Sequence, residues 1–144
     1  MADASFALKW IEREPCSDEA SELLEKCQKQ RRRLTAPALF AYEATNALAK
    51  RVKRGQVSLE IARERLAFLL ENGPALENDV AVNLRALEIT ERFSLPSDCD
   101  AHYLALAESL QCECWTADER LWNTARNELP WVRWVGQRTS AIME

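Results

Sequence analysis

The sequence predicts a single α/β domain in which a parallel sheet of short strands is flanked by helices. The chain has 144 residues, 47% of them apolar and 29% charged, which suits one globular domain with a core of its own. Segments with helical spacing of apolar residues alternate with very short apolar runs. Such alternation is typical of a parallel sheet that is covered on both faces. We find no internal repeat, linker or low-complexity stretch that would divide the chain.

The first half of the chain contains three predicted helices and one brief strand. Two of the helices begin with a serine cap, and the middle helix has a proline in its first turn and a glycine directly after its end. The third helix ends before an Asn-Gly-Pro turn. The predicted helices are residues 17–33, 37–54 and 58–71, and the strand is residues 34–36.

The second half alternates strands and helices in the same way. One of its helices is apolar nearly all round, as expected of a helix that packs against a sheet. The predicted strands are residues 75–79, 112–116 and 131–135, and the predicted helices are residues 80–93, 100–110 and 119–126.

The formal net charge of −4 argues against a surface that is positively charged overall and binds nucleic acid in that way. Two basic patches stand out locally: residues 31–33 are all arginine, and Lys50, Arg51, Lys53 and Arg54 follow one another closely. Each patch has two interpretations. Cations are favoured near the C-terminal ends of helices, where they are solvated. They would equally form a positive rim that gathers a phosphate backbone.

Other features of the composition predict a cytoplasmic protein. No apolar run approaches the roughly 18 residues that a membrane span needs, and no basic-then-apolar leader precedes the domain. The five cysteines form an odd set without a Cys-x-x-Cys pair. Free thiols in a reducing compartment explain such a set better than disulfides or a zinc site.

Four acidic residues stand in short apolar settings: Asp3, Glu43, Asp100 and Asp118. Carboxylates are rarely buried unless they are paired or bind a metal. All four fall near the predicted ends of strands or starts of helices, where open α/β sheets bind their ligands. Sets of oxygen ligands suit Mg²⁺ or Mn²⁺, and such pockets commonly cleave phosphodiesters. Asn46 shares a helical face with Glu43 and could hold a carboxylate or a water.

Five stretches in fixed order resemble the PIN-domain family of RNA nucleases, and more narrowly the VapC-type toxins. Each stretch alone is a weak signal, whereas the ordered set is specific and covers almost the whole chain. The stretches are residues 3–10, 37–48, 100–108, 115–121 and 129–135.

The resemblance implies a three-layer PIN fold over residues 1–144 and a Mg²⁺- or Mn²⁺-dependent endoribonuclease. It also implies a homodimer and inhibition by a VapB-like antitoxin. The family's metal-binding acids carry over to Asp3, Glu43, Asp100 and Asp118, and its supporting polar residues carry over to Ser5, Asn46 and Thr116.

The predicted chemistry is hydrolysis of RNA by water that divalent ions activate, with the ions held by carboxylates. In-line attack by water leaves a 5′-phosphate and a 3′-hydroxyl. Metal-free ribonucleases need a paired general acid and base, and His102 is the only histidine here. We therefore expect His102 to be a packing or hydrogen-bonding residue.

The chain departs from the family at its first strand, of which only Met1 and Ala2 precede Asp3. A misassigned start site explains this better than a real truncation, because a central strand buried on both faces is hard to delete. We expect the upstream DNA to encode about four to six further Val, Ile or Leu residues in frame. Two other functions stay open: a weakly catalytic PIN module acting as a binding or regulatory dimer, and a housekeeping nuclease for RNA processing.

Overall fold

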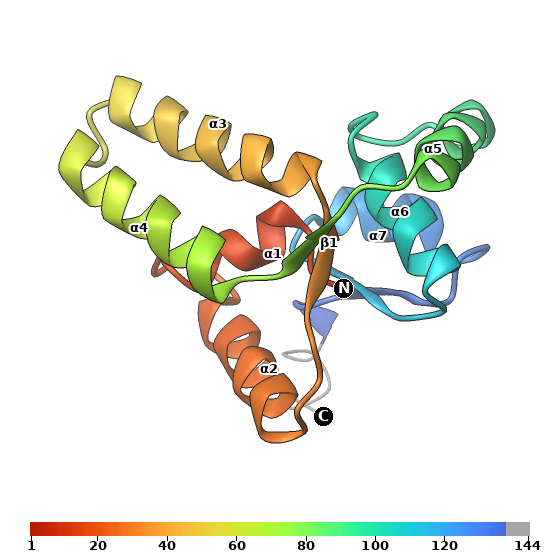
Figure 1. The fold of residues 1–144 in the computed structure, drawn as a ribbon, viewed down its shortest axis with the longest axis horizontal. Coiled ribbons are helices and arrows are strands. Elements are labelled where there is room, and N and C mark those ends of the chain that lie inside the picture. Colours follow the sequence, from red (N-terminus) through yellow and green to blue (C-terminus); the bar gives the residue numbers. More distant parts are fainter. Residues whose placement is uncertain (138–144) are drawn as a thin grey trace.

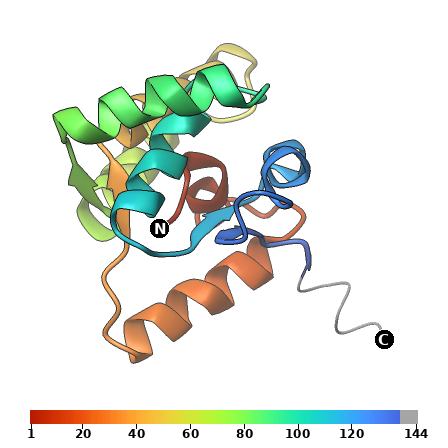
Figure 2. The same ribbon diagram turned by 90° about the vertical axis from the view of Figure 1, so that its right-hand side faces the viewer.

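Short parallel strands cross the middle of the molecule and helices pack around them (Figures 1 and 2). This computed structural model describes residues 1–137. The predicted α/β class with short parallel strands flanked by helices is confirmed. The elements are α1 (Ala4–Leu8), α2 (Ser17–Lys29), β1 (Thr35–Pro37), α3 (Leu39–Lys53), α4 (Leu59–Asn72), β2 (Ala75–Glu77), α5 (Val80–Arg92), α6 (Asp100–Ser109), β3 (Cys114–Thr116), α7 (Glu119–Ala125) and β4 (Val132–Trp134).

The strands form two parallel pairs, β1 with β2 and β3 with β4. Residues 1–3 connect the pairs. The Trp115 amide donates to the Met1 carbonyl at 3.0 Å, and the Asp3 amide donates back to Trp115 at 3.1 Å. On the other side, the Ala2 amide donates to the Thr35 carbonyl at 3.4 Å. The expected first strand is thus reduced to a bridge at Ala2, and this bridge places Asp3 between the two pairs.

The core forms where α6 meets the strands and α5. Residues 103–107 of α6 are all buried, as is Ala101 two residues earlier. The burial agrees with the nearly uninterrupted apolar character of this helix. Removing a large apolar side chain from water stabilises a fold by about 1.5–3 kcal/mol, and Leu69, Leu104 and Leu121 are all fully buried. This packing fixes the position from which Asp100 enters the site.

Several predicted boundaries are wrong, each for a local reason. Helix α2 ends at Lys29 rather than residue 33, because Arg31 takes a left-handed backbone with φ 53°. Pro37 does not begin a helix. It ends β1, and α3 starts at Leu39. The proline lacks an amide hydrogen, and the next amide, of Ala38, continues the ladder by donating to the Glu77 carbonyl at 2.8 Å.

Two further differences concern helix caps. The strand predicted over 75–79 stops at Glu77, because the Asp79 side chain accepts from the Ala81 amide at 2.8 Å and caps α5. Helix α1 was not predicted. It has only five residues, and the Asp3 side chain caps it by accepting from the Phe6 amide at 2.8 Å.

All five cysteines are free thiols; Cys114 is buried and the other four are partly buried. Among residues 1–137, no helix is long and apolar enough to span a membrane.

Candidate active site

Asp3, Glu43, Asp100 and Asp118 are presented by four different helices. Asp3 caps α1 directly after Ala2, and Asp118 caps α7 two residues after the end of β3. Glu43 lies near the start of α3, and Asp100 is the first residue of α6. The predicted placement at the carboxyl edge of the strands therefore agrees with the structure for the two aspartates that follow strands.

Asp3 is the most deeply buried of the four carboxylates, with 3% of its surface exposed. Its Oδ1 accepts from the Ser5 hydroxyl at 2.7 Å and from the Phe6 amide at 2.8 Å. Burial raises the pKa of Asp3, and the charge of Asp118 acts in the same direction, whereas hydrogen bonds from Thr116, Phe6 and Ser5 lower it. Asp3 is thus held in one orientation in a site that disfavours an isolated charge.

Ser5 and Thr116 connect Asp3 to Asp118. The two hydroxyl oxygens are 3.3 Å apart, and the Ser5 hydroxyl also accepts from the Ala117 amide at 3.1 Å. The Thr116 hydroxyl accepts from the Asp118 amide at 2.9 Å. These contacts suit the supporting roles that the family resemblance implies for Ser5 and Thr116.

Glu43 is oriented by Tyr103, whose hydroxyl donates to Oε2 of Glu43 at 2.6 Å. Burial raises the pKa of Glu43 and so does the charge of Asp3, whereas the bond from Tyr103 lowers it. Tyr103 is 1% exposed. The sequence alone does not reveal this role, because a tyrosine in an apolar helix cannot be told from a core residue without its partner.

Asp100 shows that the four acids share one electrostatic environment. Burial raises the pKa of Asp100 to about 7, and the charges of Asp3, Glu43 and Asp118 add to this effect. The Ser97 amide opposes it by donating to Oδ2 at 3.1 Å. The four carboxylates therefore accumulate negative charge that the surrounding protein only partly compensates.

Asp118 differs because it has a cationic partner. Burial raises the pKa of Asp118, but contacts from Arg120 outweigh this and lower it overall. The Arg120 amide donates to Oδ1 at 2.8 Å, and its guanidinium lies 3.2 Å from Oδ2. Arg120 was not singled out in the sequence, although its position two residues after a capping aspartate is the signal that could have identified it.

The donor set fits Mg²⁺ or Mn²⁺ in its chemistry, because all four candidate ligands are carboxylates. The arrangement of these four side chains, however, does not form a complete set of metal ligands. Across residues 1–137, no group of three or more His, Cys, Asp or Glu side chains is placed to hold a metal ion. Tyr103 occupies one oxygen of Glu43, and Arg120 contacts both oxygens of Asp118.

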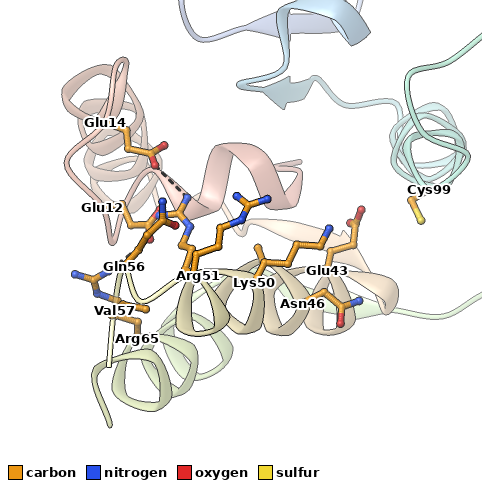
Figure 3. Close-up of a pocket in the computed structure, with 12 residues that line it drawn as sticks. Glu12, Glu14, Glu43, Asn46, Lys50, Arg51, Gln56, Val57, Arg65 and Cys99 are labelled. Atoms are coloured by element: carbon orange, nitrogen blue, oxygen red, sulfur yellow. Dashed lines mark hydrogen bonds and ion pairs between the residues drawn. The ribbon is translucent and has the colours of Figure 1, made fainter. Parts of the chain in front are cut away.

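A cleft of about 690 Å³ opens beside Glu43 and runs along α3 (Figure 3). We call it the α3 cleft. Asn46 lines it but is exposed, and its side chain forms no hydrogen bond within the described residues, so the predicted contact to a carboxylate is not seen. The lining residues are Glu12, Glu14, Glu43, Asn46, Ala47, Lys50, Arg51, Arg54, Gln56, Val57, Arg65 and Cys99.

The basic residues predicted on α3 have different surroundings. Lys50, Arg51 and Arg54 line the α3 cleft, whereas Lys53 does not. The arginines at 31–33 lie before β1, at the opposite edge of the sheet from the carboxylates. Only the patch on α3 therefore adjoins the candidate site.

Arg51 is the centre of an ion-pair network that the sequence did not reveal. Its guanidinium contacts the Glu12 carboxylate, and a second nitrogen lies 3.0 Å from Glu14 (Figure 3). Arg65 approaches Glu12 at 3.5 Å, and Lys9 approaches Glu14 at 2.7 Å. The Glu12 side chain is 4% exposed. The network joins the segment between α1 and α2 to helices α3 and α4.

Comparison with known proteins agrees with this geometry. No curated protein matches the chain. A family model described as the PIN domain matches residues 1–127, a segment that contains all four carboxylates and the whole α3 cleft. PIN domains are generally metal-dependent nucleases. On this match, the chain belongs to the PIN-domain family.

Proposed function

We propose that this protein is a metal-dependent endoribonuclease that hydrolyses phosphodiester bonds of RNA. The observation that carries the proposal is the gathering of Asp3, Glu43, Asp100 and Asp118 in one partly buried site. Burial raises the pKa of Asp100 to about 7, and the charges of the other three carboxylates add to this effect. Uncompensated negative charge of this kind favours binding of a cation. The all-carboxylate donor set suits Mg²⁺ or Mn²⁺.

The side chains have separate tasks in this proposal. A bound divalent ion lowers the pKa of water and neutralises charge on the phosphate. The four carboxylates would hold it, while Ser5 and Thr116 orient Asp3. Tyr103 orients Glu43 through its hydroxyl. The positive charge of the α3 cleft would attract the phosphate backbone of RNA to this part of the surface.

We further propose that the protein is the toxin of a type II toxin–antitoxin pair, similar to VapC. It would form a homodimer and be inhibited by a VapB-like antitoxin. The ordered set of motifs supports this narrower assignment. A neighbouring small gene for a DNA-binding antitoxin would favour it over a housekeeping nuclease. Metal-dependent cleavage of RNA by the pure protein would exclude a module that only binds.

Chelation tests the proposed function. Cleavage of an RNA substrate should cease in excess EDTA and return with Mn²⁺ or Mg²⁺, because no side chain of the site activates water unaided. Gel analysis of RNA incubated under each condition provides the measurement. Robust cleavage in EDTA by protein free of contaminating ribonuclease would refute the metal requirement.

Changing Tyr103 to Phe removes one hydroxyl from the site and keeps the buried ring. We expect Mn²⁺ to bind about 10- to 100-fold more weakly, the usual effect of losing a group that orients a metal ligand. Titration calorimetry with Mn²⁺ measures this without relying on activity. The control is Tyr42→Phe, because Tyr42 directly precedes Glu43 on α3 but is 73% exposed. Equal Mn²⁺ affinity in both variants would show that Tyr103 serves packing alone.

A further inference from the structure

The cations of the α3 cleft fall into two groups. Arg51 and Arg65 are engaged by the buried Glu12, and Arg51 also by Glu14. Lys50 and Arg54 are exposed, and within residues 1–137 neither forms an ion pair or a side-chain hydrogen bond. Their charges remain available to a ligand that enters the cleft.

We propose that Lys50 and Arg54 hold phosphates of a single-stranded RNA segment that lies along α3 beside the scissile bond. Arg51 shapes the wall of the cleft instead of contacting the RNA. Lys53 takes no part, because it lies outside the cleft. The inference rests on the proposed function and adds to it the residues that bind the substrate.

The spacing along α3 supports a continuous track. Glu43, Asn46, Lys50 and Arg54 follow one another at intervals of three or four residues and share one face of the helix. At 1.5 Å per residue, Lys50 lies roughly 10 Å and Arg54 roughly 16 Å along the axis from Glu43. Figure 3 shows Lys50 extending from α3 into the space between Glu43 and the wall formed by Glu12 and Glu14. A backbone with one phosphate at the carboxylates thus meets two further positive charges.

The recessed position of the carboxylates favours a single strand over a duplex. Asp3 is 3% exposed, and Glu43 and Asp100 are partly buried. A flexible strand bends to bring one phosphate into this recess while its neighbours stay in the cleft. A stiff A-form duplex presents its phosphates on a regular cylinder and is bound mostly by its shape. The exposed amides of Asn46 and Gln56 add hydrogen-bonding groups along the same track.

Salt-dependent binding tests the proposal on the full chain. Anisotropy of a fluorescent single-stranded RNA is measured in EDTA over a range of salt concentrations. Each phosphate contact on a single strand contributes about 0.7 to the slope of log affinity against log salt. We expect the slope to fall by about 0.7 in Lys50→Gln and by about 1.4 when Arg54→Gln is added. Lys53→Gln removes the same charge from the same helix and should leave the slope unchanged.

Several results would overturn the inference. They are an unchanged slope in the double variant, an equal loss in Lys53→Gln, tighter binding of a duplex of matched length, and equally strong competition by poly-glutamate. Cleavage in Mn²⁺ is measured on the same preparations. If the unmodified protein cleaves RNA and the double variant keeps its slope, the track is refuted and the proposed nuclease stands. Failure to cleave under any metal condition refutes the nuclease, whereas the slopes still report on RNA binding.

Discussion

Replacement of Asp100 by Asn is expected to lower RNA cleavage by roughly 10³-fold or more, the scale on which loss of one member of a catalytic unit acts. The substitution keeps the shape of the side chain and removes one of four interacting charges. The asparagine oxygen still accepts from the Ser97 amide, so the start of α6 keeps its contact. The loss of activity should therefore come without loss of the fold.

The same substitution should increase stability at neutral pH in EDTA. The pKa of Asp100 is about 7 in the folded protein and 3.8 as its ordinary value, so folded Asp100 holds its proton more tightly. Folding stability is therefore lost as the pH rises from about 4 to about 7. After a discount for the partial exposure of Asp100, the Asp100→Asn substitution should raise the free energy of unfolding by roughly 2 kcal/mol at pH 7.5 and by almost nothing at pH 4.

Urea unfolding curves of both proteins at the two pH values provide the measurement. The unmodified protein should also gain more thermal stability from Mn²⁺ than the variant, because the ion binds the folded site only. If Asp100→Asn strongly destabilises the protein at pH 7.5, Asp100 is a structural helix cap and the acids do not form one pocket.

Arg51→Gln is expected to lower the free energy of unfolding by about 3 kcal/mol, because it leaves the buried Glu12 carboxylate without its main partner. Burial raises the pKa of Glu12, and the charge of Arg51 opposes this effect. The reverse change, Glu12→Gln, should cost less, since Arg51 is 26% exposed and keeps Glu14. The double variant should recover part of the loss.

Denaturant unfolding of the two single variants and the double variant measures this coupling. Loss of an exposed ion pair lowers the free energy of unfolding by less than about 0.5 kcal/mol, and Arg51→Gln could give a loss of that size. Such a result would mean that Arg51 is free to contact RNA, and it would contradict the division of the cleft cations into two groups.

The sequence predicted helices and strands where a local pattern of residues determines the structure. The apolar run of α6 indicated a buried helix, and it is buried. Helix α1 was missed, because five residues are too few to show a helical period. Its cap, Asp3, was recognised as a candidate metal ligand and not as a helix cap.

The sequence pointed to the four acids and, through the family resemblance, to Ser5 and Thr116, but not to Tyr103 or Arg120. Tyr103 and Glu43 meet through packing of α6 against the rest of the fold, which no local pattern encodes. Arg51 resembled a solvated or RNA-binding residue, because Glu12 and Glu14 are distant in the sequence. Tertiary contacts thus decide which charged side chains are free, and the sequence alone does not contain this information.

The chemical nature of the RNA ends tests the central claim most directly. The carboxylate site should hydrolyse RNA by attack of water, so fragments made in Mn²⁺ should carry a 5′-phosphate and a 3′-hydroxyl. End mapping by ligation and phosphatase treatment identifies these groups, with Asp100→Asn as the control for contaminating ribonuclease. Fragments that end in a 2′,3′-cyclic phosphate and begin with a 5′-hydroxyl would show attack by the RNA itself and contradict the account.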